Sequence, residues 1–268
     1  MQEQEAEGGE TLVHSLYTAT SGMVAGLKGH DVIAGNLANA DTSGYKRDMA
    51  ITGSFQKEMV RSLAGSRRES QVSATGIGFL GYGSYVHSIA SDHSQGPLIE
   101  TQGVLDLAID GDGYFVVSGP SGELYTRSGA FRLSPSGMVT TMSDMPVLGM
   151  SGPISIPPEA GKIEVLADGT VLVDGAAYDR LRIVSLDNMS LARKAGDGLF
   201  RIPPGSSRHA GTGSFAIRQG FLEMSNVDSI SEMVRMIAGM RTYEACQKMI
   251  WAIDQTLDKT VSDVGRVV

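Results

Sequence analysis

Two glycine- and aspartate-rich motifs in the sequence have spacings that could bind a nucleotide or a cation. Gly76, Gly78 and Gly81 in GIGFLG match the glycine spacing of a dinucleotide-binding turn. That turn needs a strand before it and a helix after it, and the flanking RRESQVSAT and YGSYVHS predict neither. DGDGY at 110–114 resembles the start of an EF-hand loop, but the twelfth position, which needs a glutamate, holds Ser121. We therefore expect neither a nucleotide site nor a calcium site.

Histidine, cysteine and serine residues also lack the arrangements that catalysis or metal binding requires. The histidines are scattered, without ligand spacing or a carboxylate companion: His14, His30, His87, His93 and His209. The single cysteine, Cys246, falls in an apolar helical rhythm, where a small packed side chain is the ordinary interpretation. No G-x-S-x-G nucleophile motif is present. The sequence predicts no catalytic residue, no cofactor and no metal, so we expect a protein that is not an enzyme.

Composition and charge narrow the possible partners. The 268 residues carry a formal net charge of −8, which disfavours nucleic acid and anionic membrane surfaces as main partners. No run of eighteen apolar residues is present, so no membrane insertion is expected. The N-terminal MQEQEAEGGE lacks the basic and apolar regions of a Sec signal peptide.

The N-terminal segment predicts a helix that ends abruptly. Apolar residues fall near one stripe at Leu12, Leu16, Met23, Leu27, Ala34 and Leu37. Glycine is costly inside a helix, so the small residues Gly22, Ala25, Gly26 and Gly29 indicate close approach of another backbone. The helix is expected to end where turn-forming residues follow, at Asn39, Asp41, Ser43 and Gly44.

The middle of the chain predicts β structure. Residues 46–100 mix charges, serines and glycines without sustained periodicity, and we expect an extended connector with weak strands. Residues 104–220 contain short, partly alternating apolar runs separated by turn sequences: 111–113, 135–137, 168–169, 174–175 and 197–198. Short strands with Asp-Gly turns predict antiparallel hairpins, and the absence of long helical patterns disfavours a parallel sheet.

The C-terminal segment predicts a second long helix. Ser229 and Glu232 have the spacing of a capping box. Ile230, Met233, Ile237 and Met240 follow a 3-4-3 rhythm, and after one slip it resumes at Tyr243, Cys246, Ile250, Ile253, Leu257, Val261 and Val264. Such a sustained apolar seam is typical of a coiled coil.

We therefore predict an α+β fold in which paired N- and C-terminal helices form a coiled-coil layer that flanks an antiparallel, hairpin-rich all-β domain. The expected domains are residues 1–45 with 226–268 as a discontinuous helical domain, 46–100 as the connector and 101–225 as the β domain.

Three blocks in this order resemble the rod and hook family of bacterial flagellar axial proteins. They are SLYTATSGM with NLANADTSGYKR, then LDLAIDGDGYFVV with YTRSGAFRLSPSGMV, then QGFLEMSNVDSISEMV with RTYEACQKMI. The resemblance covers nearly the whole chain from Leu12. The central part looks more like rod subunits than the hook subunit, and it favours a proximal over a distal rod subunit.

The resemblance implies a structural subunit of the flagellar basal-body rod, outside the cytoplasmic membrane. Such subunits polymerise into a tubular drive shaft that transmits torque and encloses the export channel. The implied partners are further copies of the chain, neighbouring rod and hook axial proteins, and the flagellar export apparatus. The motif residues implied to link layers and subunits are Asn36, Leu37, Asn39, Thr42, Gly44, Tyr45, Ser225, Asn226 and Val227, while Ile237, Met240, Ile250 and Leu257 are expected to face partner helices.

The sequence departs from the family at its beginning and leaves other functions open. The family usually starts close to SLYTA, so we expect the acidic residues 1–11 to be absent from assembled protein. A distal rod or hook-type subunit is the nearest alternative. A periplasmic hydrolase would need a clustered acid pair or a nucleophile, and none is visible. A β-rich binding module that uses its helices for oligomerisation is disfavoured because motifs match at both ends.

Overall fold

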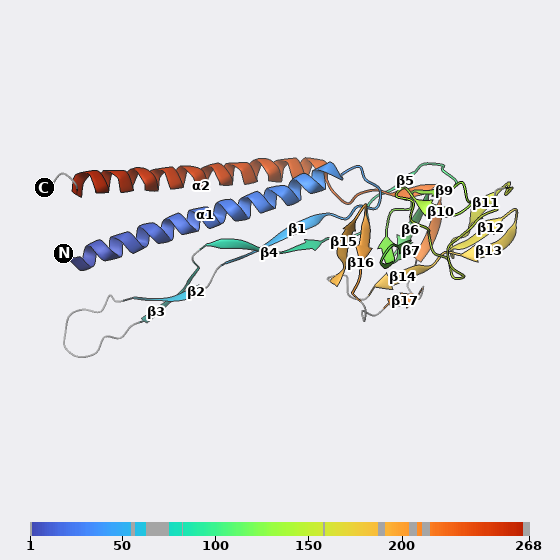
Figure 1. The fold of residues 1–268 in the computed structure, drawn as a ribbon, viewed down its shortest axis with the longest axis horizontal. Helices are drawn as coiled ribbons and strands as arrows, with labels where there is room; N and C mark the ends of the chain where they lie inside the picture. Colours follow the sequence, from blue (N-terminus) through green and yellow to red (C-terminus); the bar gives the residue numbers. More distant parts are fainter. Residues whose placement is uncertain are drawn as a thin grey trace. The chain divides into compact units, whose positions relative to one another are not determined.

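The computed structural model describes residues 2–54, 57–62, 75–81, 83–157, 159–186, 191–203, 208–210 and 215–264. Side chains are described within 14–54, 83–157, 159–185, 191–203 and 215–262. Helix α1 spans Gln2–Ala38 and helix α2 spans Ser229–Val264, with strands β1 to β19 between them (Figure 1). The fold is α+β with mainly antiparallel sheets, which confirms the predicted class. No helix in the described part of the chain is long and apolar enough to cross a membrane.

The chain divides into two compact units. The first, called the helical unit, contains Met1–Gly35, Asp48–Ala90 and Ile230–Val268. The second, called the β unit, contains Asn36–Arg47 and Ser91–Ser229. The three-part domain division expected from the sequence stays a prediction, because compactness does not show which segments fold independently.

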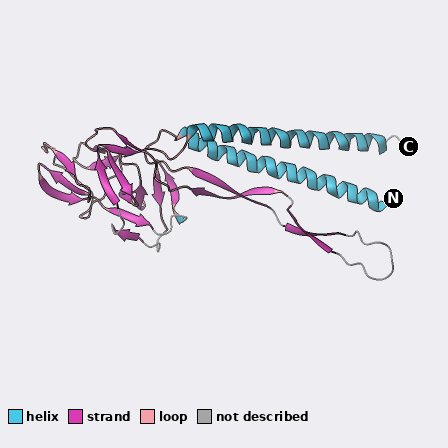
Figure 2. Cartoon of the chain, turned by 180° about the vertical axis from the view of Figure 1, so that it is seen from behind, coloured by secondary structure: helices cyan, strands magenta, loops and turns pink. Residues whose placement is uncertain are grey.

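In the helical unit, the stretch expected to be an extended connector forms a long hairpin. Strand β1 (Asp48–Ser54) pairs with β4 (Ser84–Ser91), and β2 (Lys57–Ser62) pairs with β3 (Thr75–Gly81). The two ladders follow one another along the hairpin (Figure 2). The weak strands predicted between residues 46 and 100 are thus present as two ladders.

Two glycines mark where α1 and α2 come into contact. A Cβ placed on Gly22 would lie 3.4 Å from Cys246 Sγ, and one on Gly239 would lie 3.0 Å from His30 Nε2. The second contact is further along α1 and further back along α2, as antiparallel neighbours require. Gly26 and Gly29 would have no atom of the described chain within 4 Å of an added Cβ. The neighbour of Gly22 is therefore the Cys246 side chain, and the close approach of another backbone predicted from these small residues is wrong at Gly22, Gly26 and Gly29.

The apolar residues of α2 form two stripes on different faces instead of the single seam predicted. Ile253 is buried, and Tyr243, Cys246 and Ile250 are half-buried. The earlier residues are exposed, a set consisting of Ile230, Met233, Val234, Ile237 and Met240. Three successive steps of three residues, from Ile237 to Cys246, rotate the pattern by roughly half a turn, because an α-helix has 3.6 residues per turn. Between Ile237 and Cys246, where the spacing of apolar residues departs from the 3-4 alternation, the apolar stripe therefore moves to another face of α2.

The β unit contains the remaining strands in several small sheets. The six-stranded sheet has the order β15-β16-β8-β7-β14-β17, a three-stranded sheet has the order β11-β12-β13, and three pairs are β10-β9, β18-β6 and β19-β5. Their bounds are β5 Leu98–Glu100, β6 Leu107–Gly111, β7 Tyr114–Gly119, β8 Gly122–Thr126, β9 Phe131–Leu133, β10 Val139–Thr141, β11 Ile163–Val165, β12 Thr170–Val173, β13 Ala176–Arg180, β14 Ile183–Leu186, β15 Arg193–Gly196, β16 Leu199–Arg201, β17 Arg208–Ala210, β18 Phe215–Gln219 and β19 Phe221–Glu223.

The core of the β unit lies on both faces of the six-stranded sheet. Along β7, Phe115 and Val117 belong to one apolar cluster, whereas Tyr114 and Val116 belong to another. Side chains of a strand alternate between the two faces of a sheet. When both faces are covered, all residues of the strand are buried and its sequence is continuously apolar. This accounts for the uninterrupted YFVV sequence.

The turn sequences lie where the sequence analysis placed them. Asp174 and Gly175 join β12 to β13 with φ of 51° and 82°, and Asp197 and Gly198 join β15 to β16 with φ of 49° and 69°. Two consecutive residues with positive φ are the requirement of the tight hairpin turn that matches strand twist. The predicted antiparallel hairpins are confirmed at these connections.

One edge of the three-stranded sheet is closed by a side chain. The N–H of Val165 donates to Gln219 Oε1 at 3.0 Å, and Gln219 Nε2 donates to Ile163 O at 3.1 Å. Gln219 Nε2 also donates to Val104 O at 2.8 Å. The amide of Gln219 therefore makes the pair of hydrogen bonds that a further strand would make along β11.

We predict that Gly129→Ala destabilises the β unit by about 3 kcal/mol or more, because the new Cβ cannot be accommodated without moving backbone. The ideal Cβ would lie 1.6 Å from Leu107 O at the start of β6. Urea unfolding of the purified variant measures the change. Gly35→Ala is the matched control, since an added Cβ there meets no described atom within 4 Å. Wild-type stability for Gly129→Ala would contradict the backbone contact.

Candidate functional site

The N-terminal motif ends α1 and turns the chain back on itself. Helix α1 stops at Ala38, and the N–H groups of Asn39 and Thr42 donate to Asn36 O at 3.1 Å and Asn39 O at 3.2 Å. Asn36 is buried, and its Oδ1 accepts a hydrogen bond from the hydroxyl of Tyr45 at 3.3 Å. The side chains of the motif therefore hold their own turn together.

Gly44 lets this turn lie directly against the β unit. Its φ is +69°, and an added Cβ would lie 2.2 Å from the backbone nitrogen of Ser128. Its N–H donates to Glu223 O at 2.7 Å. Ser43 and Ser128 share a hydroxyl hydrogen bond of 3.0 Å beside it. Both the backbone conformation and the lack of space require glycine here.

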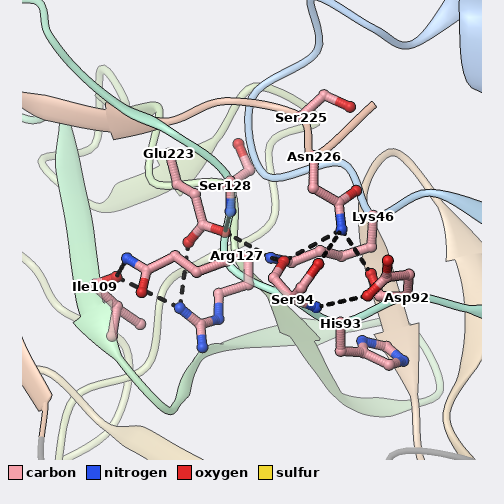
Figure 3. A network of polar contacts seen from close by, with 12 residues as sticks. Lys46, Asp92, His93, Ser94, Ile109, Arg127, Ser128, Glu223, Ser225 and Asn226 are labelled. Carbon is pink, nitrogen blue, oxygen red and sulfur yellow. Dashed lines mark hydrogen bonds and ion pairs between the residues drawn. The ribbon is translucent and has the colours of Figure 1, made fainter. Parts of the chain in front are cut away.

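A buried carboxylate joins three distant segments next to this turn (Figure 3). Lys46 Nζ lies 2.6 Å from Glu223 Oε1, and both side chains are 0% exposed. Arg127 Nη1 lies 3.2 Å from Glu223 Oε2. The partners of Glu223 come from the end of the N-terminal motif and from the segment after β8. The ion network therefore connects parts of the chain that local structure does not hold together.

The remaining hydrogen-bonding capacity of the three charged groups is largely met by backbone. Lys46 Nζ donates to Ser94 O at 2.7 Å, and the N–H of Gly96 donates to Glu223 Oε1 at 3.1 Å. Arg127 Nη2 donates to Gly111 O at 2.8 Å. A buried charge is tolerated when it is both paired and hydrogen-bonded, and this network fulfils both conditions except at Arg127 Nε, which is buried without a hydrogen-bond partner among the described residues.

The C-terminal motif contributes an amide that binds two strand ends. Asn226 Oδ1 accepts from the N–H of Arg47 at 2.8 Å. Asn226 Nδ2 donates to Asp92 O at 2.9 Å and to Ser94 Oγ at 3.0 Å (Figure 3). Arg47 also pairs with Asp92 through a 3.2 Å contact that is partly exposed. One asparagine side chain thus joins the chain segments around residues 47, 92 and 226.

A lysine from β15 covers the other side of the N-terminal motif. Lys194 Nζ lies 3.9 Å from the centre of the Tyr45 ring and donates to Lys46 O at 2.5 Å. A cation over an aromatic face is attracted by the ring quadrupole. The β unit therefore contacts the turn through Lys194 as well as through Ser128 and Glu223.

Charge and burial shift the protonation equilibria of the site. The buried trio of Lys46, Arg127 and Glu223 has two positive charges and one negative charge. Burial lowers the pKa of Lys46, and the attraction of Glu223 partly offsets that effect. A hydrogen bond from the Ser94 backbone lowers the pKa of Asp92. The hydrogen bond from Ser94 thus favours the charged form of the Asp92 carboxylate, whereas burial favours the neutral form of Lys46.

An aromatic cluster beside the network contains a histidine that resists protonation. His93 Nδ1 lies 3.0 Å from the hydroxyl of Tyr114, and the His93 ring packs against Phe200 at 5.2 Å between centroids. Burial lowers the pKa of His93 to about 4, with further contributions from the positive charges of Lys46 and Lys194. Burial likewise raises the pKa of Tyr114. His93 is therefore neutral in the folded protein at neutral pH.

The arrangement fits a structural joint and offers little to a substrate. Its charged groups are paired with one another, and Lys46, Arg127 and Glu223 are buried. Among the residues that the structure describes, no group of three or more His, Cys, Asp or Glu side chains could hold a metal ion. The site joins the segment that follows α1 to the segment that precedes α2, within the β unit.

The structure brings both sequence motifs into one place. Gly44 and Arg47 bond directly to Glu223 and Asn226, and Val227 N donates to Ser225 Oγ at 3.2 Å. The motif residues in or beside this joint are Asn36, Leu37, Asn39, Thr42, Gly44, Tyr45, Ser225, Asn226 and Val227. The other predicted residues, Ile237, Met240, Ile250 and Leu257, lie along α2 in the helical unit. A role of either set in subunit assembly stays a prediction.

Sequence reasoning missed the charged residues of the joint. Lys46 and Glu223 are 177 residues apart, and Arg127 and Glu223 are 96 apart, so no local spacing relates them. The available signal was weak: each motif is flanked by a charged residue next to apolar or aromatic neighbours, as in GYKR and FLEMSN.

Comparison with known proteins gives three matched segments and full-length relatives. Residues 16–46 match the flagella basal body rod protein model, 108–173 the flagellar hook protein FlgE/F/G D1 domain, and 218–263 the flagellar basal body rod FlgEFG protein C-terminal model. The chain is 33% identical to flagellar basal-body rod protein FlgF of Caulobacter vibrioides, over 95% of this chain and 98% of the relative. It is 34% identical to flagellar basal-body rod protein FlgG of Bacillus subtilis, over 94% and 99%. It is 32% identical to FlgF of Salmonella typhimurium, over 90% and 94%.

A β unit that fastens two terminal helices through a buried ion network defines a structural subunit with discontinuous helical ends. The matched segments 16–46 and 218–263 meet at this network. The chain belongs to the flagellar basal-body rod protein family, which confirms the family resemblance inferred from the sequence.

We predict that Glu223→Gln destabilises the β unit by about 3–5 kcal/mol, because it leaves Lys46 and Arg127 buried together without a carboxylate. Lys46→Met should cost clearly less, since the Arg127–Glu223 pair remains. Urea unfolding gives both values. Asp144→Asn is the control, because its pair with Arg132 is exposed and contributes little. Equal losses for Glu223→Gln and Asp144→Asn would rule out a central role for the carboxylate.

The low pKa of His93 predicts acid sensitivity. Below pH 6.5 His93 becomes protonated in the unfolded chain, whereas in the folded chain it stays neutral down to about pH 4. The free energy of unfolding therefore falls as the pH is lowered from 6.5 to about 4. The His93→Gln variant should lack the part of this pH dependence that comes from His93. The unfolding free energy of the variant should therefore fall less than that of wild type between these pH values. Unfolding curves at several pH values measure the difference. The exposed His87, changed to Gln, should follow wild type throughout; a His93→Gln profile parallel to wild type would contradict the assignment.

Proposed function

We propose that this rod-family protein, a structural subunit of the flagellar basal body, polymerises into the tubular shaft that transmits torque and encloses the export channel. Its partners are further copies of the chain and neighbouring rod and hook axial proteins. The subunit reaches the rod through the flagellar export apparatus and has no enzymatic activity. The observation that carries the proposal is the agreement of full-length relatives with matched models at both helices and in the β unit.

We propose further that α1 and α2 pair as a coiled-coil layer in the assembled rod. The support is the contact of Gly22 with Cys246 and of Gly239 with His30. The half-buried positions 243, 246 and 250 and the buried Ile253 add the 3-4 spacing of a helix–helix seam. On this proposal Ile250 and Leu257 belong to the intrachain seam, whereas Ile237 and Met240 point to other subunits.

The position of the subunit along the rod is a finer part of the proposal. A proximal position is favoured by the sequence of the central segment, and a distal rod or hook-type position is the alternative. Relatives named FlgF and FlgG are similar to the chain at nearly equal identity, 33% and 34%.

A disulfide test addresses both rod membership and helix pairing. Gly22→Cys places a thiol next to Cys246, so mild oxidation should form an intramolecular disulfide in protein recovered from purified basal bodies. The product is read from faster migration on a non-reducing gel and from its mass. We expect most of the Gly22→Cys protein to be cross-linked.

Gly26→Cys is the matched control, one turn further along α1, where an added Cβ meets no described atom within 4 Å. It should remain reduced under the same conditions. Absence of the wild-type protein from basal bodies would refute the rod assignment. Presence without a Gly22→Cys disulfide would refute the pairing alone.

A further inference from the structure

Among the residues that the structure describes, the helical unit has at least two apolar surfaces that no other described part of the chain covers. The first is a groove between α1 and β4, with a volume of about 250 Å³, lined by Tyr17, Thr20, Val24, Lys28 and Tyr85 among others. We call it the α1 groove. Val24 is 50% exposed and Tyr17 is 57% exposed, so its apolar wall faces outward.

The second surface is the exposed stripe at the start of α2, which we call the α2 stripe. It consists of Ile230, Met233, Val234, Ile237 and Met240, which are 45–70% exposed. These positions recur at three- and four-residue intervals, so they form one face of the helix. The stripe lies on a different face from the half-buried residues that follow Tyr243, so contact with α1 of the same chain does not explain it.

The two surfaces match in length. From Tyr17 to Lys28 the groove extends about 17 Å along α1, and from Ile230 to Met240 the stripe extends about 15 Å along α2, at 1.5 Å per residue. A helix face of three turns can therefore fill the groove without overhang.

The area is sufficient for a specific contact. Side chains of this size at these exposures present on the order of 100 Å² each, so covering both surfaces would bury on the order of 1,000 Å² in total. That is the lower end of the range for specific protein–protein interfaces. Exposed apolar surface of this extent marks an interaction site.

We propose that the α1 groove of one subunit receives the α2 stripe of a neighbouring copy of this chain. The inference rests on the proposed rod function. The groove and the stripe are different surfaces, so the contact is heterologous, and a contact of this kind repeats into rings or helical filaments instead of closing as a two-fold dimer.

The direction of the incoming helix follows from polarity. The contacts at Gly22 and Gly239 make α1 and α2 antiparallel within one chain. Copies in a polymer of one polarity keep this relation, so α2 of the neighbour runs antiparallel to α1. Aligning groove and stripe then pairs Val24 with Met233 and Tyr17 with Met240. Arg241, next to Met240, comes close to the exposed Tyr17 ring, where a cation is favoured.

Inter-subunit cross-linking tests this pairing. In a Cys246→Ala background, Val24→Cys combined with Met233→Cys should give a ladder of dimers and higher multimers after oxidation of purified basal bodies. Each single-cysteine protein should stay monomeric, because the groove does not meet a groove and the stripe does not meet a stripe. Val24→Cys with Ala238→Cys is the control, since Ala238 is exposed on α2 outside the stripe. It should give no ladder.

The outcomes separate the inference from the rod assignment. If the Val24→Cys, Met233→Cys protein is present in basal bodies but forms no ladder, the groove–stripe contact is wrong and the rod function stands. Dimers of a single-cysteine protein would also overturn it. If the wild-type chain is absent from basal bodies, the rod function fails and this inference fails with it.

A charge pair provides a second measurement that does not depend on cysteine chemistry. Val24→Asp and Met233→Lys should each abolish motility by placing an unpaired charge in the contact. The two together should restore motility at least in part, because the charges would meet across neighbouring subunits. Loss of motility in the double variant equal to that in the single variants, with normal cellular protein levels, would overturn the proposal.

Discussion

The architecture depends on one buried carboxylate. One carboxylate oxygen of Glu223 pairs with Lys46 and the other pairs with Arg127. The backbone carbonyl of Glu223 accepts a hydrogen bond from the N–H of Gly44. These contacts join the end of α1, the core hairpins and the strand that leads toward α2. A buried carboxylate with two cationic partners is satisfied in one geometry only, since moving any partner leaves a charge without compensation. The ion network therefore fixes the segment that follows α1 and the segment that precedes α2 within the β unit.

This joint separates two kinds of surface with different physical demands. The β unit buries its apolar side chains in two clusters, whereas the helical unit leaves much of its apolar surface exposed. A domain with its own core is stable as a monomer, but an exposed apolar helix face is stabilised by a partner. The division fits a subunit that folds one part alone and completes the other part by association. The charges of the joint stay inside the β unit, where assembly does not disturb them.

The sequence predicted those features that local chemistry determines. Helix ends at Ala38 and Ser229, and hairpin turns at Asp174-Gly175 and Asp197-Gly198, follow from turn and cap residues that act over a few positions. Apolar runs between the turn sequences predicted strands, and β7 with its YFVV sequence is one of them. These signals work because each element carries its own pattern of period two or 3.6.

The sequence did not predict what depends on distant contacts. Lys46, Arg127 and Glu223 are ordinary charged residues until the fold places them together. The apolar rhythm of α2 was read as a single seam, although the three-residue steps after Ile237 already require a change of face. A periodicity defines stripes, and the neighbouring elements decide which stripe is covered.

The side-chain amide at the edge of β11 has a consequence for growth of the polymer. Subunits packed side by side in a shaft are at very high local concentration, and an open strand edge under those conditions would pair with the edges of other copies. Gln219 occupies the hydrogen-bonding positions of Ile163 and Val165 that such pairing would use. The β unit is thereby protected at that edge against fibre-like strand addition.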